Sequence, residues 1–276
     1  MNLPKTPSFR LDGRRALVTG ASSGIGFGAA AALAAAGAHV WLVARRAAEL
    51  EQARALIMTQ VTAGSTSVSN NVSVPNNISV SNNISVSCKV LDITDLEQTA
   101  AFVQSAGPFD VLVNSAGLAR HAPALETTPE AYDAAMGLNL RAAYFLTREV
   151  ARGLIAAGKR GSLINVSSQM GHVGGQDRAV YCATKHALEG MTKAMALEWA
   201  SQGIRVNTLC PTFIRTPLAE QTLANPERKA WILSKIKLGR VGEIEDLMGP
   251  VVFLASDASA MMTGTHLIID GGWTAE

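Results

Sequence analysis

The chain has 276 residues, of which 48% are hydrophobic and 17% are charged, and its formal net charge is +2. This length and composition suit a single well-packed α/β domain near the upper size for one hydrophobic core. The near-neutral charge and the absence of a basic stripe argue against nucleic-acid binding.

The segment between Arg15 and Arg45 contains no Lys, Arg, Asp or Glu and is long enough to be confused with a membrane span. Its glycines and serines favour a strand, a turn and a buried helix instead. No secretory signal with a basic start and a cleavable apolar core occurs at the N-terminus. The three cysteines have no metal-ligand spacing and are typical of reduced thiols. We therefore expect a cytoplasmic protein with no membrane partner and no metal.

A glycine-rich turn lies between a short apolar strand predicted at 15–19 and an alanine-rich helix predicted at 24–36. Gly20 permits the tight turn, Gly24 lets the backbone approach a pyrophosphate, and Gly26 allows the helix to pack closely on the strand. A strand, a glycine turn and a helix N-terminus together form a phosphate cradle. The predicted dinucleotide contacts in this turn are Gly20, Ser22, Ser23, Gly24, Ile25 and Gly26.

The end of the second strand, predicted at 39–43, bears on the choice of cofactor. Proteins that prefer NAD place an acidic residue here to bind the ribose hydroxyls, whereas this chain has Ala44 followed by Arg45. The planar guanidinium of Arg45 can pair with a 2′-phosphate. The alternative is that Arg45 and Arg46 only begin a solvated helix. Because no acid is present to repel the phosphate, we expect NADP, with NAD as the less favoured cofactor.

The alternating pattern breaks between residues 63 and 87, where an Asn-Asn-apolar-Ser-Val-x hexapeptide occurs three times. Asn-Asn favours turns and the apolar–Ser–Val part favours extended chain, but three short copies cannot bury a core of their own. We expect an exposed, mobile insertion in this range. The alternatives are a small β-excursion and a partner-binding flap.

The regular alternation of elements predicts a Rossmann-type α/β fold, a doubly wound parallel sheet of about seven strands with helices on both faces. Strands are predicted at 15–19, 39–43, 88–91, 110–113, 162–166, 204–209 and 265–269. Helices are predicted at 24–36, 47–62, 95–105, 129–153, 179–201 and 243–256. Ligands of such sheets bind at the carboxyl ends of the strands. The residues that follow strand ends, and are therefore expected to meet, are Thr19, Asp92, Asn114, Ser168 and Pro211.

Tyr181 and Lys185 lie four residues apart on the helix predicted at 179–201, so their side chains project from one face. Tyrosine has a reference pKa of about 10 and is a poor base at neutral pH. A nearby ammonium favours the phenolate, so the pair can exchange a proton with an alcohol or a carbonyl. We expect Ser168, upstream of Tyr181, to hold the substrate oxygen by a hydrogen bond.

From Leu11 to Gly272 the chain resembles the short-chain dehydrogenase/reductase family. The motifs that carry the resemblance are Thr19-Gly20-x-x-x-Gly24-Ile25-Gly26, Asp92-Ile93, Asn114-Ser115-Ala116-Gly117, Leu138-Asn139-Leu140, Ser168 and Tyr181-x-x-x-Lys185. The resemblance implies a catalytic tetrad of Asn139, Ser168, Tyr181 and Lys185, in which Asn139 holds a water of the proton relay. It also implies a homotetramer. Further cofactor contacts implied by it are Asp92, Ile93, Asn114, Ala116, Gly117, Tyr181, Lys185, Pro211, Ile214 and Thr216.

Two positions depart from the family pattern. Ser115 replaces the second asparagine of the Asn-Asn-Ala-Gly segment, and Thr212 replaces the glycine that usually follows Pro211. That glycine lies beside the nicotinamide in the family, so the family pattern does not determine the backbone conformation at Thr212. We expect cofactor binding to survive.

The resemblance implies that residues 1–276 form one dinucleotide-binding catalytic domain with a substrate lid at about 217–237. Polar residues near the tetrad, with His121 and His172 among them, favour a sugar, a polyol or a sugar acid over an apolar substrate. The predicted substrate contacts are Ser168, Gln169, Gln176, Arg178 and Tyr181, with Arg178 as a partner for a carboxylate. The lid segment Asn225–Trp231 is similar to that of gluconate-type sugar-acid dehydrogenases.

The expected reaction is therefore hydride transfer between the nicotinamide and a secondary alcohol or ketone. One alternative is a 3-oxoacyl carrier-protein reductase. A second, from another class, is a dinucleotide-binding sensor without turnover, although such proteins usually lose the tyrosine or the lysine that this chain keeps.

Overall fold

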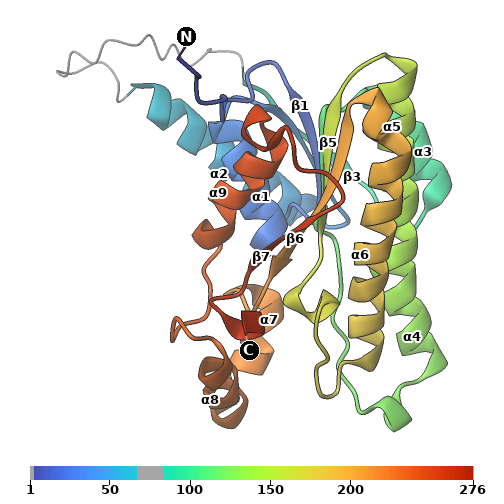
Figure 1. The fold of residues 1–276 in the computed structure, drawn as a ribbon, viewed down its shortest axis with the longest axis vertical. Helices are drawn as coiled ribbons and strands as arrows, with labels where there is room; N and C mark the ends of the chain where they lie inside the picture. The colour runs from blue at the N-terminus through green and yellow to red at the C-terminus, as the bar shows by residue number, and fades with distance from the viewer. Residues whose placement is uncertain (1–2, 67–83, 276) are drawn as a thin grey trace.

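A computed structural model describes residues 3–66 and 84–275 of the chain. Its centre is a fully parallel sheet (Figure 1). The seven strands of this sheet lie in the order β3-β2-β1-β4-β5-β6-β7. The predicted sheet is thereby confirmed. The strands are β1 (Arg15–Thr19), β2 (His39–Ala44), β3 (Val86–Val90), β4 (Val111–Asn114), β5 (Gly161–Val166), β6 (Ile204–Pro211) and β7 (His266–Ile269).

Helices cover both faces of the sheet (Figure 1). One face is covered by α1 (Gly24–Ala35), α2 (Ala47–Thr66) and α9 (Glu245–Ala255). The opposite face is covered by α3 (Leu96–Ala106), α5 (Ala143–Ala156) and α6 (Ala179–Trp199), with α4 (Pro129–Met136) leading into α5.

The two hydrophobic cores follow from the alternation of side chains along the central strands. In β1, Ala16 and Val18 pack under α1, whereas Leu17 between them packs on the opposite side, with residues of α5. Helix α1 is buried along most of its length because its alanines let it lie close to the sheet. Burial on both faces fixes the register of β1 and, with it, the place of the glycine turn that follows.

The structure corrects the sequence prediction at three places. The helix predicted at 129–153 is interrupted by a π-helical turn, Gly137–Ala142, and continues to Ala156. The predicted lid contains two short helices that the pattern did not reveal, α7 (Pro217–Leu223) and α8 (Pro226–Lys235). Both helices begin with a proline after a capping Thr216 or Asn225, which explains why their N-termini are sharply defined.

The third correction concerns the repeat segment. Helix α2 extends to Thr66 and β3 begins at Val86, so both ends of the range 63–87 belong to regular elements. Residues 67–83 lie outside the described part of the chain, and so does the prediction made for them. Among residues 3–66 and 84–275, no helix is long and apolar enough to cross a membrane.

Candidate active site

A cavity of about 460 Å³ opens at the carboxyl ends of the strands. It extends from the glycine turn after β1, past the ends of β2, β4 and β5, to the start of α6 and to α7. The residues that the sequence places after strand ends therefore do gather at one edge. This is the edge at which parallel α/β sheets bind ligands.

The glycine turn leaves no room for side chains. Gly20 and Gly24 have positive φ angles of 66° and 58°. A Cβ on Gly20 would lie 3.0 Å from the Ala116 backbone, and a Cβ on Gly26 would clash with the Gly20 carbonyl oxygen. Thr19 fixes the other side of the turn, since its Oγ1 accepts hydrogen bonds from the backbone N–H groups of Ser115 and Ala116, both at 3.1 Å.

At the far end of the cavity, Arg45 and Asp92 form an exposed ion pair with an N–O distance of 3.6 Å. Burial acts to raise the pKa of Asp92, but hydrogen bonds from Thr94 and the charge of Arg45 outweigh it, so the pKa is lowered. The Arg45 side chain is 72% exposed and free to turn towards a ligand.

The wall of the cavity carries buried polar atoms without hydrogen-bond partners. They are His121 Nδ1, Ser167 Oγ, Gln169 Nε2 and Thr212 Oγ1. Leaving such atoms unpaired is costly unless a ligand or water satisfies them. Together with the glycine cradle, they fit a long ligand rich in oxygen atoms, as a dinucleotide with a hydroxylated substrate would be.

Ser168 and Tyr181 meet in this cavity. Ser168 follows β5 and caps a short 3₁₀ turn, Gln169–Gly171, where its Oγ accepts a hydrogen bond from Met170 N at 3.1 Å. Burial raises the pKa of the Tyr181 phenol, while its hydrogen bond with Ser168 and the positive charge of Arg178 act in the opposite direction.

Lys185 lies one turn after Tyr181 on α6 and is only 7% exposed. Its Nζ donates a hydrogen bond to Val166 O at 2.8 Å and lies 5.6 Å from the centre of the Tyr181 ring. Burial lowers the pKa of Lys185 to about 8. The nearby cation that opposes the rise of the Tyr181 pKa in this structure is Arg178, a contribution that the sequence-based prediction, which relied on Lys185, did not identify.

Two predicted site asparagines lie beneath the cavity wall. Asn139, in the π-helical turn, accepts a hydrogen bond from Leu118 N at 2.8 Å and donates one to Leu118 O at 2.9 Å. Asn114 Nδ2 donates to Thr147 and Asn165, at 2.8 and 2.9 Å. Both side chains thus brace the segments that form the wall.

Arg178 is half-buried beside Tyr181. Its Nη1 donates to His121 Nε2 at 2.8 Å, and its guanidinium lies over the Phe213 ring, 5.1 Å from the centroid. Burial and the charge of Arg178 lower the pKa of His121 to about 4, so this imidazole is neutral and can accept the bond. Among the described residues, no carboxylate lies within ion-pair distance of Arg178. Its charge is therefore available to a ligand.

Not every polar residue predicted near the tetrad reaches the cavity. Gln176 is exposed and is not part of the lining, and His172 is directed towards Glu189. Conversely, the predicted contacts did not include Phe213 or the α7 residues Leu218 and Thr222, which line the cavity. The sequence does contain a signal for the two α7 residues. A capping threonine and a proline indicate a helix start, and the i, i+4 spacing of Leu218 and Thr222 then places both on one face of that helix.

Comparison with known proteins gives matches over nearly the whole chain. A family profile described as enoyl-(acyl carrier protein) reductase matches residues 20–274. L-xylulose reductase of Bos taurus is 40% identical over 266 residues, covering 96% of this chain and 98% of that protein. Gluconate 5-dehydrogenase of Gluconobacter oxydans is 36% identical over 270 residues, covering 96% of each. A Burkholderia cenocepacia gluconate 5-dehydrogenase, crystallised with NADP and tartrate, is 33% identical and has a TM-score of 0.84, covering 97% of this chain and 98% of that one.

Proposed function

Because the chain belongs to the short-chain dehydrogenase/reductase family, we propose that it is an NADP-dependent oxidoreductase of sugar acids. Its reaction class is the NAD(P)-dependent interconversion of a secondary alcohol and a ketone. The observation that carries the substrate class is the half-buried Arg178, a guanidinium beside Tyr181 with no carboxylate of the described chain to pair with.

Tyr181 transfers the proton in this reaction. In reduction its hydroxyl donates a proton to the carbonyl oxygen, and in oxidation its phenolate accepts the proton of the alcohol. The positive charge of Arg178 stabilises that phenolate, and Ser168 holds the substrate oxygen next to it. The bound nicotinamide supplies or accepts the hydride.

The residues present fit NADP. The glycine turn provides backbone N–H groups at the start of α1 for the pyrophosphate, and Arg45 provides a guanidinium for the 2′-phosphate. Asp92 already pairs with Arg45, so cofactor binding requires Arg45 to exchange or share this partner. The residues proposed to hold the cofactor are Gly20, Ser22, Ser23, Gly24, Ile25, Gly26, Arg45, Asp92, Ile93, Asn114, Ala116, Gly117, Tyr181, Lys185, Pro211, Ile214 and Thr216.

Arg178 gives the substrate its orientation. A charge-assisted, bidentate pair with a carboxylate offsets the burial of the guanidinium and places the hydroxylated carbons next to Ser168 and Tyr181. Phe213 fixes the plane of the guanidinium from one side, and His121 occupies one of its donors. The relatives that act on gluconate, and the one crystallised with tartrate, are consistent with a hydroxy acid in this position.

The lid over the substrate is formed by α7, whose Pro217, Leu218, Ala219 and Thr222 line the cavity. Helix α8 packs behind it, where Ile232 joins a small apolar cluster with Phe213 and Trp273. The lid thus supports, through Phe213, the same arginine that we propose to bind the carboxylate.

A panel of substrates tests the substrate class. We expect kcat/KM for gluconate-like hydroxy acids to exceed that for a 3-oxoacyl thioester, because the thioester offers no carboxylate to the Arg178 guanidinium. The reactions are followed by nicotinamide absorbance with NADP(H). A hundredfold preference for the thioester would show that the protein is a 3-oxoacyl carrier-protein reductase instead.

We further propose a cytoplasmic homotetramer. The three free cysteines support a reducing compartment. A shallow apolar depression lined by Phe9, Met248, Phe253 and Leu267, next to the edge strand β7, supports self-association, since exposed apolar surface marks contact sites. Light scattering coupled to size-exclusion chromatography measures the mass directly, and a monomeric mass would refute the tetramer.

A further inference from the structure

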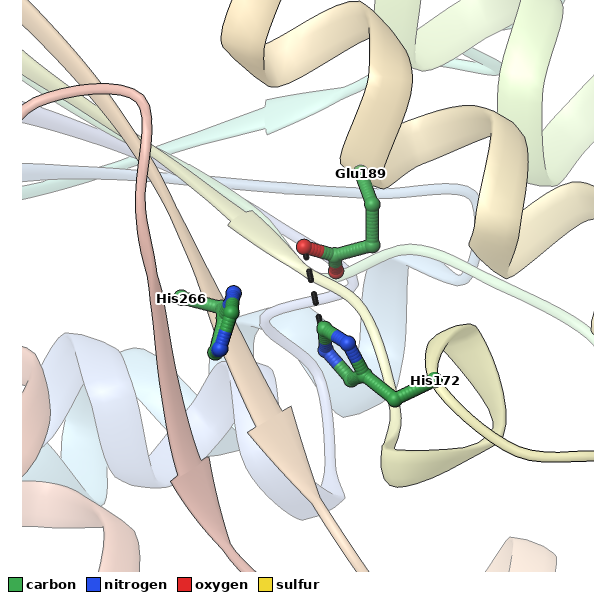
Figure 2. Close-up of side chains that lie close together, drawn as sticks. All are labelled: His172, Glu189 and His266. Atoms are coloured by element: carbon green, nitrogen blue, oxygen red, sulfur yellow. Dashed lines mark ion pairs between the residues drawn. The ribbon is translucent and has the colours of Figure 1, made fainter.

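Three side chains with metal-binding chemistry converge at a place that the proposed reaction does not use (Figure 2). His172 follows the 3₁₀ turn after Ser168, Glu189 lies on α6, and His266 is the first residue of β7. One potential ligand atom from each lies within 4.8 Å of the other two. None of the three lines the cavity. They are far apart in the sequence, which is why no ligand spacing revealed them.

Glu189 is the buried member of the cluster, with a side chain only 8% exposed. Its Oε2 accepts a hydrogen bond from Thr208 Oγ1 at 2.9 Å, and its Oε1 accepts one from the Cys210 thiol at 3.3 Å. Within the described part of the chain, its one ion-pair partner is His172, with a distance of 3.8 Å from Nε2 to Oε2. A buried carboxylate held in place by two neutral donors, with no Lys or Arg paired to it, is suited to a cation.

The two imidazoles are arranged so that both can reach the carboxylate. Their ring centroids are 4.4 Å apart and their planes are inclined by 54°. Figure 2 shows His172 and His266 approaching Glu189 from different segments of the chain. The His266 side is exposed to solvent, which gives an ion a path to enter.

We propose that His172, Glu189 and His266 form a Zn²⁺ site. Two imidazoles and one carboxylate are a ligand set that suits zinc, whereas Mg²⁺ and Ca²⁺ prefer oxygen ligands. Zinc bonds of about 2.0–2.1 Å in tetrahedral geometry place ligand atoms about 3.3 Å apart. The ligand atoms, which lie within 4.8 Å of one another, therefore need to approach by at most about 1.5 Å, and rotation of the exposed His266 side chain would bring its ring closer. The fourth position is left for a water molecule.

The site has a structural consequence. His172 ends the turn that begins with Ser168, Glu189 is one helical turn beyond Lys185, and His266 belongs to the last strand. A zinc ion would therefore tie together the loop after β5, helix α6 and the edge strand β7. We expect it to stabilise the fold around the cavity without contacting the substrate.

The test is calorimetric titration of the tag-free, EDTA-treated protein with ZnCl₂, using wild type, His266→Ala and His172→Ala. We expect one zinc per wild-type chain. Loss of either histidine should weaken binding at least about tenfold, since even outer-shell losses cost about 10–100-fold. His186→Ala is the matched control, because His186 is an exposed residue of α6 bonded to Cys182 O of its own helix. Its affinity should equal that of wild type.

A second readout is thermal unfolding with and without ZnCl₂. The midpoint of wild type and of His186→Ala should rise with zinc, and that of His266→Ala should not, because only a ligand of the native state stabilises it. Equal zinc affinity in wild type and His266→Ala would place the ion outside this cluster and overturn the proposal. Failure of wild type to bind zinc, or equal binding of MgCl₂, would do so as well.

Discussion

Replacing Lys185 with methionine should stabilise the cofactor-free protein at neutral pH while abolishing turnover. Burial lowers the pKa of Lys185 from 10.5 to about 8, so the unfolded chain binds more protons than the native one between these values. The free energy of unfolding of wild type therefore rises with pH between about pH 8 and 10.5. Below about pH 8 the buried ammonium destabilises the native state to its full extent. A shift of this size corresponds to about 3 kcal/mol.

The variant also loses the hydrogen bond from Nζ to Val166 O, which costs about 1 kcal/mol at every pH. We therefore expect Lys185→Met to be more stable than wild type by roughly 2 kcal/mol at pH 7. Near pH 10.5 it should be about 1 kcal/mol less stable, so the order of the two proteins reverses.

Urea unfolding followed by tryptophan fluorescence measures this difference, since the chain contains four tryptophans. Lys193→Met, at an exposed position of the same helix, is the control and should show no such pH dependence relative to wild type. A stability difference between Lys185→Met and wild type that does not change between pH 7 and 10.5 would refute the buried, pKa-shifted lysine.

Three further predictions concern other parts of the molecule. Tyr181→Phe should abolish turnover and leave NADP(H) affinity, measured by fluorescence titration, within a few-fold, and retention of more than about a tenth of kcat would exclude the assigned proton transfer. Arg45→Ala should raise KM for NADP(H) about tenfold or more, because a charge-assisted phosphate contact is worth about 1.5–3 kcal/mol. An unchanged NADP/NAD preference would show that this contact does not exist. A short turn in place of residues 67–83 should leave folding and kcat nearly intact, since loop length adds little closure entropy, whereas insoluble protein would show a structural role.

The sheet and the glycine turn could be predicted because local signals and tertiary packing agree. The apolar strand at 15–19, the glycines after it and the alanine-rich helix each specify their own conformation, and parallel pairing then places the strand ends together. The strand and helix boundaries accordingly differ from the predicted ones by a few residues at most places.

The side-chain contacts inside the site were harder to predict from the sequence, because they join segments that are distant along the chain. Arg178 was predicted as a substrate contact, but its bond to His121 and its stacking on Phe213 join three loops that no periodicity connects. The same holds for the hydrogen bonds of Asn139 to Leu118. Gln176 illustrates the converse, since proximity to Arg178 in the sequence does not place its side chain in the cavity.

The most direct test of the proposed function compares kcat/KM for a gluconate-like acid and for the neutral polyol of the same length, in wild type and in Arg178→Met. Loss of the carboxylate contact should lower kcat/KM for the acid about 10- to 100-fold more than for the polyol. The polyol corrects for the influence of Arg178 on the Tyr181 pKa, which affects both substrates. Arg54→Ala, which removes an exposed arginine of α2, should change neither value. An equal loss for acid and polyol in Arg178→Met would contradict the carboxylate site.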